Sequence, residues 1–303
     1  MIDLTIIIVS YNTKDFLEKC LRSVFINKPQ KYSFEVIVVD NASTDGTSDA
    51  ISRLKDDKPL AENFTFIQNK ENLGFSKGNN IGVKKAKGRY VLFLNSDTEI
   101  RENTLDTMIA FMESHMDAGA ATCKVMMLSG RLDDASHRGF PTPWNAFCHF
   151  SGLSRLLPYS MKFNGYNLAW KDLNRTHEIN ALAGAFMLVR REAGEAVGWW
   201  DEDYFFYGED LDFCYMLSKI GWKIYYIPVV SILHYKGVSG GIKAASKDLT
   251  TASKETKKRA TVARFNAMKI FYKKHYMQMY PKITTWLIMK GIDTKLWIAM
   301  RKA

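Results

Sequence analysis

The run Tyr90-Val91-Leu92-Phe93-Leu94-Asn95-Ser96-Asp97 decides the fold of this chain. Its five apolar residues predict a short buried strand over 90–94, and polar residues follow at once. In open α/β sheets, ligands bind just outside the carboxyl ends of the strands. We therefore expect Asp97 at a ligand-binding edge of a sheet.

On both sides of this run, apolar stretches alternate with helical patterns. The predicted strands cover 5–9, 34–39, 64–67, 90–94, 120–128, 185–189 and 223–227, and Pro228 is expected to close the last one. The predicted helices cover 16–25, 105–116 and 211–220, with another that ends at Lys87. Such alternation with short turns is typical of an α/β fold in which helices flank a mostly parallel sheet.

Two segments depart from this alternation. Residues 129–180 are rich in Gly, Pro, His and aromatic residues without a clear period, so we expect a loop-rich insertion over the site. Residues 253–280 follow a helical period, which Pro281 breaks. Its apolar stripe consists of Val262, Phe265, Met268, Tyr272, Tyr276 and Met279. We expect a main domain over 1–241 and a basic helical extension over 242–303.

The net positive charge of the chain comes from this extension. Residues 242–303 hold 15 lysines and arginines but only 3 acidic residues, whereas the whole chain has a net charge of +10. A nearly neutral body with a basic tail suggests contact with an anionic surface, such as the inner face of a cell membrane, through 253–303. The equally supported alternative is a helix that packs its apolar stripe onto the body and leaves a solvated basic face.

The composition limits the class of protein. The 303 residues are 47% hydrophobic and 13% aromatic, which suffices for a packed core and excludes general disorder. Four scattered cysteines lack a Cys-x-x-Cys pair or zinc-like histidine spacing, so we expect a reducing, cytoplasmic compartment. We expect neither a cleaved signal nor a membrane-spanning helix, because no basic stretch precedes the first strand and no run of about 18 apolar residues occurs.

Polar side chains follow several predicted strands, and each has two interpretations. Tyr11 and Asp40 follow the first two strands, where they can stack on and hydrogen-bond a nucleobase, or Asp40 can simply cap a turn. Asn95-Ser96-Asp97 resembles an Asp-x-Asp pattern, which holds Mg²⁺ or Mn²⁺ against a diphosphate. As an isolated tripeptide, it is also typical of an ordinary turn.

A second acidic group follows the aromatic run Tyr204-Phe205-Phe206-Tyr207-Gly208. Glu209 and Asp210 open a predicted helix, where acids are favoured by the helix dipole and act as caps. The preceding rings also predict an apolar wall that raises the basicity of a carboxylate, which suits a general base. His234 is interpreted as a metal ligand or a phosphate donor, with a purely structural histidine as the alternative.

Five motifs occur in the order seen in family 2 glycosyltransferases, and the chain resembles this family over residues 3–240. The motifs are Ile7-Ile8-Val9-Ser10-Tyr11-Asn12, Val38-Val39-Asp40-Asn41-Ala42-Ser43-Thr44-Asp45-Gly46-Thr47, Asn72-Leu73-Gly74-Phe75-Ser76-Lys77-Gly78-Asn79-Asn80, Leu94-Asn95-Ser96-Asp97-Thr98 and Tyr207-Gly208-Glu209-Asp210-Leu211-Asp212. The chain looks most like the bacterial rhamnosyltransferase-like branch of inverting enzymes with the GT-A fold.

The resemblance implies a Rossmann-like GT-A catalytic domain over 1–241. The implied reaction moves a sugar from a nucleotide-diphosphate sugar, of the dTDP-rhamnose or UDP-sugar type, to a hydroxyl of a glycan or lipid-linked acceptor in cell-surface polysaccharide synthesis. The resemblance also implies Asp210 as the catalytic base and Asp97, with His234, as ligands of Mg²⁺ or Mn²⁺.

The resemblance assigns further residues to the two substrates. The donor-side residues are Ser10, Tyr11, Asn12, Asp40, Asn72, Gly74, Asn79, Asn95 and Asp97. The acceptor-side residues are Gly184, Ala185, Trp200, Asp201 and Glu209. The chain departs from the family pattern at Asn95, which replaces an acid of the metal motif, and at Met216, which replaces a basic residue often found after the Glu-Asp pair.

Other classes of protein fit the sequence less well. A nucleotidyltransferase acting on sugar phosphates would share the nucleotide crevice, but residues 5–12 contain no Gly-rich triphosphate loop. A non-catalytic membrane- or nucleic-acid-binding module would explain the basic tail but not Asp97 and Asp210, and we expect no nucleic-acid partner. A Rossmann dehydrogenase is disfavoured because no Gly-x-Gly-x-x-Gly follows the first strand. The sequence leaves the sugar, the base, the acceptor and the oligomeric state open.

Overall fold

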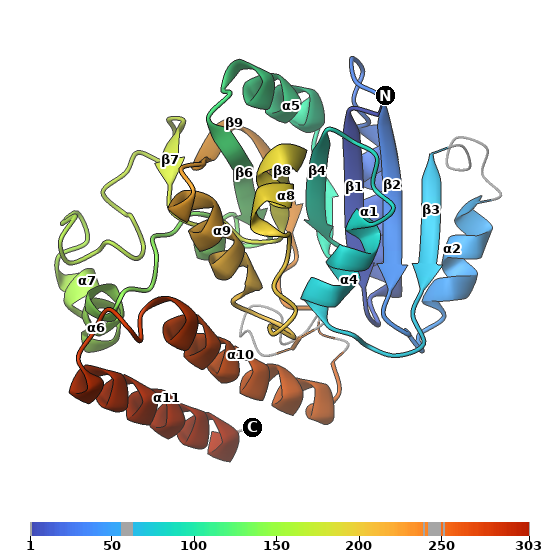
Figure 1. Ribbon diagram of the computed structural model, residues 1–303. Helices are drawn as coiled ribbons and strands as arrows, with labels where there is room; N and C mark the ends of the chain where they lie inside the picture. Colours follow the sequence, from blue (N-terminus) through green and yellow to red (C-terminus); the bar gives the residue numbers. More distant parts are fainter. Residues whose placement is uncertain (1, 56–62, 239, 242–249, 251, 303) are drawn as a thin grey trace.

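The computed structural model describes residues 2–55, 63–238, 240–241, 250 and 252–302, and a twisted sheet runs through its middle (Figure 1). The strands are β1 (Leu4–Ser10), β2 (Phe34–Asp40), β3 (Phe64–Gln68), β4 (Tyr90–Asn95), β5 (Thr98–Ile100), β6 (Ala118–Met127), β7 (His177–Ile179), β8 (Phe186–Arg190) and β9 (Lys223–His234). Their order across the sheet is β3-β2-β1-β4-β8-β6-β9-β5, and β7 pairs with β9. The predicted α/β fold is confirmed, although the sheet is mixed because β8 runs antiparallel to β4 and β6.

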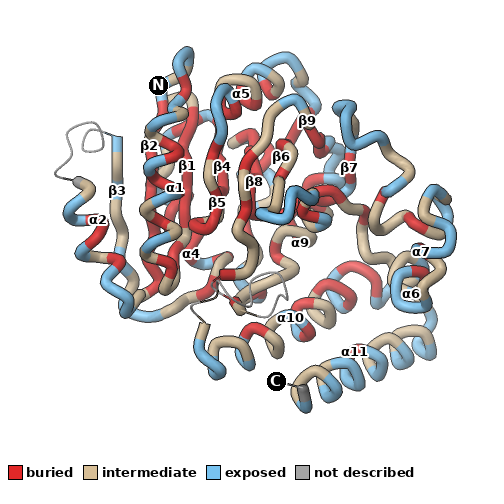
Figure 2. Tube along the Cα trace, turned by 180° about the vertical axis from the view of Figure 1, so that it is seen from behind, coloured by how far each residue is buried: buried red, intermediate tan, exposed pale blue. Residues whose placement is uncertain are grey.

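Helices cover both faces of this sheet (Figures 1 and 2). They are α1 (Lys14–Ile26), α2 (Thr47–Lys55), α4 (Phe75–Val83), α5 (Thr104–Ser114), α6 (Pro143–Ser151), α7 (Leu153–Leu156), α8 (Arg191–Val197), α9 (Glu209–Lys219), α10 (Lys254–His275) and α11 (Lys282–Lys302), with one 3-10 turn, η1 (Asp134–Ser136). Side chains of α1, α2 and α5 share a core with Ile6 and Ile8, whereas those of α4, α8 and α9 share the opposite core with Ile7. Since successive side chains of a strand point to opposite faces, the wholly apolar run in β1 fills both cores.

The expected end of the last strand at Pro228 is wrong. Strand β9 continues to His234, and its pairing with β6 shifts so that Cys123 faces Ile227 while Lys124 faces Ser231. The proline therefore lies in an irregularity of the ladder, where its missing N–H costs no strand hydrogen bond. Beyond this point β9 pairs with β5, with His234 directly opposite Thr98. The irregular strand thus carries the histidine to the segment that contains Asp97.

Two other segments differ from their predictions. Helix α4 ends at Val83 rather than near Lys87. Residues 129–180 are loop-rich as expected, but they also contain η1, α6, α7 and the short strand β7. These elements are too short to show a clear hydrophobic period, so the sequence pattern could not reveal them.

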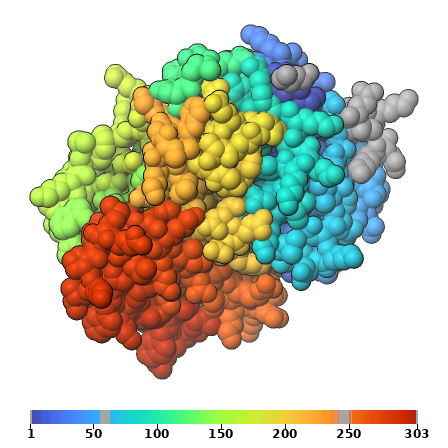
Figure 3. Space-filling model, viewed as in Figure 1, coloured from blue at the N-terminus to red at the C-terminus, as the bar shows by residue number. Residues whose placement is uncertain are grey.

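Helix α10 packs on the body of the protein rather than standing free. Phe265, Tyr272 and Tyr276 of the predicted stripe are buried, and so is Phe271, which the stripe did not include. Met279 lies beyond the end of α10 and is exposed. Figure 3 shows α10 and α11, in orange to red, in continuous contact with the green and yellow parts of the molecule. For α10, the structure therefore favours the packed-helix alternative.

Asp212 fastens α10 to α9 through a buried ionic cluster. Its Oδ1 accepts a hydrogen bond from His275 Nε2 at 2.6 Å, and its Oδ2 accepts one from Lys274 Nζ at 2.8 Å. The hydroxyl of Tyr204 donates to Oδ1 at 3.2 Å. Burial by itself would raise the pKa of Asp212, but the bonds from His275 and Lys274 lower it. The helix that begins with Glu209 and Asp210 is thus held in place by residues of the C-terminal extension.

Replacing Asp212 by alanine is expected to lower the free energy of unfolding by about 3 kcal/mol, because a buried ion pair that loses one partner leaves an uncompensated charge. Urea unfolding followed by tryptophan fluorescence measures the change. Asp293→Ala is the matched control, since Asp293 pairs with Lys269 at the exposed surface and should show no measurable effect. Equal midpoints for Asp212→Ala and wild type would contradict the proposed link.

Within the described residues, no helix combines the length and the apolar character that a membrane span requires.

Candidate active site

The carboxyl ends of three strands lie level with one another. Ser10 of β1 is paired with Asp40 of β2, and Val9 is paired with Asn95 of β4. The hydroxyl of Thr13 bridges two of these ends, because Thr13 Oγ1 lies 3.0 Å from Ser10 Oγ and 2.9 Å from the hydroxyl of Ser96. The two polar motifs therefore meet at one rigid edge of the sheet.

At this edge, Asp40 stabilises a turn, as the capping alternative predicted. Its two carboxyl oxygens accept hydrogen bonds from the backbone and the hydroxyl of Ser43, at 2.9 and 2.5 Å. Burial raises the pKa of Asp40, and the bonds from Ser43 act in the opposite direction. Asn12 belongs to the same turn, since its Oδ1 accepts from Thr44 N at 2.8 Å. The side chain of Asp40 has no exposed surface, whereas Tyr11 at the end of the neighbouring strand is half-buried.

The segment that contains Asn72, Gly74 and Asn79 touches the aromatic run. Phe75 N donates to the carbonyl oxygen of Phe205 at 2.9 Å, and a Cβ on Gly74 would collide with that oxygen. Gly74 has φ +85°, a conformation that favours glycine. Asn72 Oδ1 accepts from Gly74 N at 3.0 Å, and the side chain of Asn79 donates to Phe75 O at 3.0 Å. Both asparagines therefore shape the loop at the start of α4.

Asp97 and His234 face each other in a buried position. His234 Nε2 lies 3.3 Å from Asp97 Oδ1, yet it is not aligned with a hydrogen-bond partner among the described residues. Burial lowers the pKa of His234, but the carboxylates of Asp97 and Asp133 raise it to about 9. Burial alone would raise the pKa of Asp97, and attraction to His234 lowers it instead. The surroundings favour positive charge at this point, carried by a proton on His234 or by a bound cation.

Asp133, which the sequence patterns did not indicate, orients His234. Its Oδ2 accepts a hydrogen bond from His234 Nδ1 at 2.9 Å, and its Oδ1 pairs with Lys236. When a carboxylate binds one ring nitrogen, the lone pair of the neutral imidazole is on the other nitrogen, as in many metal-bound histidines. Here that nitrogen is Nε2, which faces Asp97. The donor set therefore fits a hard divalent cation held by one carboxylate and one imidazole.

Such a cation would need further ligands from substrate and water. Within the described part of the chain, no three His, Cys, Asp or Glu side chains are grouped closely enough to hold a metal ion by themselves. Mg²⁺ commonly keeps several waters and binds through one or two carboxylates plus substrate phosphates. Asp97 and His234 are compatible with that kind of open site.

Asp210 lies at the start of α9 and is paired with an arginine from the loop-rich segment. Arg138 Nη2 lies 2.6 Å from Asp210 Oδ2, and Asp210 Oδ1 accepts from Leu211 N at 2.8 Å. Burial would lower the pKa of Arg138, but the charge of Asp210 raises it, so the guanidinium stays charged. The loop-rich segment thus supplies a group at the expected catalytic base, which no pattern in 129–180 had indicated.

Glu209 is buried next to this pair, and burial raises its pKa to about 8, with the charge of Asp210 adding to the effect. Its Oε2 has no hydrogen-bond partner among the described residues. At neutral pH, Glu209 is therefore largely protonated. Arg138 pairs with Asp210 at 2.6 Å, and the structure records no such pair for Glu209 among the described residues.

The raised pKa of Glu209 predicts a pH-dependent stability. Its ordinary pKa is 4.5. Between that value and about 8, the unfolded chain releases the proton and the folded chain keeps it, so wild-type stability falls as the pH rises. Glu209→Gln does not ionise and should lose less stability over this range. One pKa unit corresponds to about 1.4 kcal/mol. Up to pH 8, the free energy of unfolding of the wild type should therefore fall by several kcal/mol more than that of Glu209→Gln.

Urea unfolding at a series of pH values measures this difference. Exposed Glu192→Gln is the control and should follow the wild type. Parallel curves for wild type and Glu209→Gln would show that Glu209 is ionised in the folded protein.

Tyr207 lies near two acidic groups, Asp97 and the Glu209-Asp210 pair. Burial raises the pKa of its phenol, and the charges of Glu209 and Asp97 raise it further, while Arg264 opposes them. A Cβ on Gly240 would lie 2.9 Å from the Tyr207 hydroxyl, and Gly240 follows closely after Val238, whose N–H donates to Asp97 Oδ2 at 3.4 Å. The structure therefore brings Asp97 and the Glu209-Asp210 pair to the same region.

The acceptor-side residues have mainly structural contacts. Trp200 is only 2% exposed and packs against Phe93 in the core, and its expected role toward the acceptor stays a prediction. Asp201 pairs with Lys274 at 2.7 Å, and Ala185 O accepts from the backbone N–H of Asn95 at 3.2 Å. At Gly184, a Cβ would lie 3.1 Å from the ring of Phe75.

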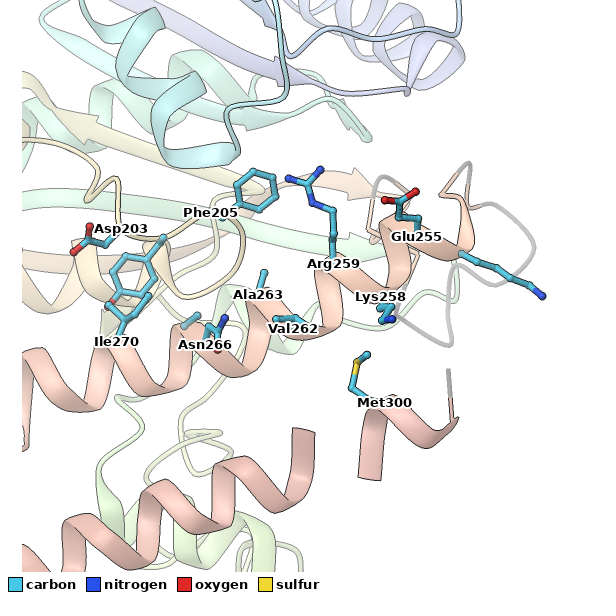
Figure 4. A pocket seen from close by; sticks show the side chains of 13 residues that line it. Asp203, Phe205, Glu255, Lys258, Arg259, Val262, Ala263, Asn266, Ile270 and Met300 are labelled. Carbon is cyan, nitrogen blue, oxygen red and sulfur yellow. The ribbon is translucent and has the colours of Figure 1, made fainter. Parts of the chain in front are cut away.

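A cavity of about 970 Å³ lies between the segment 203–205 and α10 (Figure 4). Its cationic side chains are those of Lys254, Lys258 and Arg259, and Val262, Ile270 and Met300 supply apolar lining. The guanidinium of Arg259 lies 4.9 Å from the ring centroid of Phe205. Neither Asp97 nor Asp210 lines this cavity, so it is separate from these two acidic groups.

Comparison with known proteins agrees with these features. The family model described as "Glycosyl transferase family 2" matches residues 5–172. Rhamnosyltransferase WbbL of Escherichia coli (strain K12) is 28% identical over 239 residues, which cover 76% of this chain and 82% of WbbL. N-acetylglucosaminyl-diphospho-decaprenol L-rhamnosyltransferase of Mycobacterium tuberculosis (strain ATCC 25618 / H37Rv) is 26% identical over 257 residues, which cover 80% of this chain and 79% of that protein.

Solved structures share the fold at low sequence identity. GalNAc-T7, crystallised with UDP, GalNAc and Mn²⁺, has a TM-score of 0.57 at 17% identity, and the match covers 77% of this chain but only 44% of that one. The mannosyltransferase PcManGT from Pyrobaculum calidifontis, in complex with GDP-Man and Mn²⁺, has a TM-score of 0.55 at 17% identity and covers 98% of this chain and 88% of its own. The GT-A fold expected from the motifs is confirmed. Since the family model also covers more than half of the chain, from β1 into the loop-rich segment beyond β6, this protein belongs to glycosyl transferase family 2.

Proposed function

We propose that this glycosyltransferase moves a sugar from a nucleotide-diphosphate sugar to a hydroxyl group with inversion at the anomeric carbon. The donor is of the dTDP-rhamnose or UDP-sugar type, and the acceptor is a glycan or a lipid-linked saccharide of a cell-surface polysaccharide. A position on the inner face of the cell membrane belongs to the same proposal, because a lipid-linked acceptor is embedded there. The relatives named as rhamnosyltransferases support this choice of donor.

One observation carries the proposal. Tyr207 comes two residues before Glu209, and its hydroxyl would lie 2.9 Å from a Cβ on Gly240, which follows closely after the Val238 N–H that donates to Asp97 Oδ2. We infer from this proximity that the acid next to His234 and the acid pair next to Arg138 serve one site. Inverting transfer needs this division of labour, because the leaving diphosphate and the attacking hydroxyl require different partners at the same moment.

The proposed roles follow from the chemistry of each group. Asp210 accepts the proton of the acceptor hydroxyl as its oxygen attacks the anomeric carbon. Arg138 holds the carboxylate of Asp210 in a fixed orientation through the 2.6 Å contact. Asp97 and His234 would hold Mg²⁺ or Mn²⁺, and the cation would supply positive charge against the diphosphate of the leaving group. Ser10, Tyr11, Asn12 and Asp40 form the side of the site that receives the nucleobase.

A donor screen tests the proposed function. The purified protein is incubated with dTDP-rhamnose and several UDP-sugars in the presence of Mg²⁺ or Mn²⁺, and nucleoside diphosphate release is followed. We expect release from one class of donor, an increase when acceptor is added, and loss of release in a chelator. Unchanged release in the chelator would contradict the metal, and release of pyrophosphate from a nucleoside triphosphate and a sugar phosphate would contradict the reaction.

A further inference from the structure

Helix α11 is apolar on two opposite sides. One side packs inward, where Ile288 and Met289 contact the cluster of Phe271, Tyr272 and Tyr276. The other side carries Ile283, Trp286, Leu287, Trp297 and Ile298, which are 42% to 64% exposed. With 3.6 residues per turn, these five positions form one stripe along the helix. We call this stripe the α11 face.

Positive charges border and interrupt the α11 face. Lys290 and Arg301 fall within the stripe, and the guanidinium of Arg301 lies 3.5 Å from the ring centroid of Trp297. Helix α11 has five lysines and arginines but a single acid, Asp293, which is bound to Lys269 of α10. The exposed apolar side chains are therefore mixed with cations that outnumber the acids of their helix five to one, and Asp293 also attracts Lys290.

A second element extends the apolar surface. Helix α6 exposes the rings of Trp144, Phe147 and Phe150, although it lies far away in sequence. The ammonium group of Lys295 in α11 lies 3.1 Å from the ring centroid of Phe150. Figures 1 and 2 both show α6 and α7 beside α11 at the same end of the molecule. Exposed aromatic residues of the loop-rich segment and of the C-terminal helix are thus adjacent.

We propose that the α11 face, together with the exposed rings of α6, binds the surface of an anionic lipid bilayer. Helices that lie in a membrane interface combine Trp, Leu and Phe on one side with Lys and Arg near the headgroups. A second copy of the chain is a poorer occupant, because a symmetric contact would bring the cations of two α11 helices together. Helix α10 does not contribute its stripe, since that stripe packs on the body.

The inference deepens the proposed function, on which its purpose rests. A protein bound to a lipid surface has to search only that surface for a lipid-linked acceptor. The residues around Asp97 and Asp210 then need not bind the membrane themselves. Lipid binding can be measured without any sugar transfer, so a failure of one idea is distinguishable from a failure of the other.

Sedimentation of the full chain with sucrose-loaded vesicles tests the proposal. We compare vesicles of phosphatidylcholine with vesicles that also contain phosphatidylglycerol, at low and high salt. The wild type should bind the anionic vesicles and lose binding at high salt, since each basic residue near such a surface contributes about 1 kcal/mol. Trp286→Ser/Trp297→Ser and Lys290→Glu/Arg301→Glu should each weaken binding by roughly tenfold or more.

Ile26→Ser is the matched control, because Ile26 is an exposed apolar residue on α1 and its removal should leave vesicle binding unchanged. Nucleotide binding by all variants should equal that of the wild type. Absence of wild-type binding, or equal binding by the double Trp variant, would overturn the proposal. A wild-type dimer in sedimentation velocity that becomes monomeric in the double Trp variant would identify the face as a self-interface instead.

Discussion

Asp210→Asn is expected to reduce sugar transfer by about 10²–10⁴-fold, the range that a positioned general base typically contributes. Asparagine keeps the shape of the side chain and its contact with Leu211 N, but it cannot take up the acceptor proton. Donor binding should be unaffected, since the donor-side residues lie at the ends of β1, β2 and β4. Steady-state kinetics and calorimetric titration with the nucleoside diphosphate measure the two effects separately.

Asp172→Asn is the control, because Asp172 lies at the surface in an exposed pair with Arg175. It should retain wild-type rates. If Asp210→Asn transferred sugar at a near-normal rate, another group would be the base. If it lost donor binding as well, Asp210 would act on the donor rather than on the acceptor hydroxyl.

Asp97→Ala is expected to weaken metal-dependent donor binding by at least about 100-fold. Changes to outer partners of metal ligands already cost about 10–100-fold in metal affinity, and Asp97 Oδ1 lies only 3.3 Å from His234 Nε2. Calorimetric titration of Mn²⁺ into the protein with nucleoside diphosphate measures the loss without any turnover. Donor binding in a chelator should be the same for variant and wild type.

His234→Ala should cause a similar loss, and the double variant should be little worse than either single one. Such non-additivity is expected when two side chains hold the same ion. Independent, additive losses would show that Asp97 and His234 act at different points. Full metal affinity in Asp97→Ala would remove the proposed cation site.

Most of the sheet could be predicted from the sequence because its buried strands consist of consecutive apolar residues. The run 90–94 and its polar successor predicted both β4 and the position of Asp97 at a strand end. The predicted strand end at Pro228 was wrong. A proline normally ends a strand, whereas here the pairing of β9 with β6 shifts register around it. The short elements in 129–180 had no period, so the sequence could not show that Arg138 would reach Asp210.

The candidate site was less predictable than the fold because its supporting contacts join distant residues. Asp133 is 101 residues from His234, and Asp212 is 63 residues from His275. Neither pair has a spacing that a helix or strand would produce. Asp40 and Trp200 were expected to bind substrates, but each also makes a structural contact that explains its position. Asp40 accepts a hydrogen bond from Ser43, and Trp200 packs against Phe93.

We propose that α10 belongs to the catalytic domain and that the boundary expected at residue 241 lies later. Asp212 of α9 binds His275 and Lys274 of α10 in a buried position. Tyr215 of α9 also packs against Phe271. In contrast, the outer side of α11 has no protein partner among the described residues.

The contacts of Asp212 with α10 determine where this protein can be truncated without loss of stability. Truncation after residue 241 would remove the positively charged partners of the buried Asp212 carboxylate. It would also expose the ring of Tyr215, which packs against Phe271. A shorter truncation from the same end is far milder, because a cut near Pro281 removes only α11. A minimal crystallisable enzyme should therefore end between Tyr276 and Pro281, even though every recognisable sequence motif is already complete some forty residues earlier.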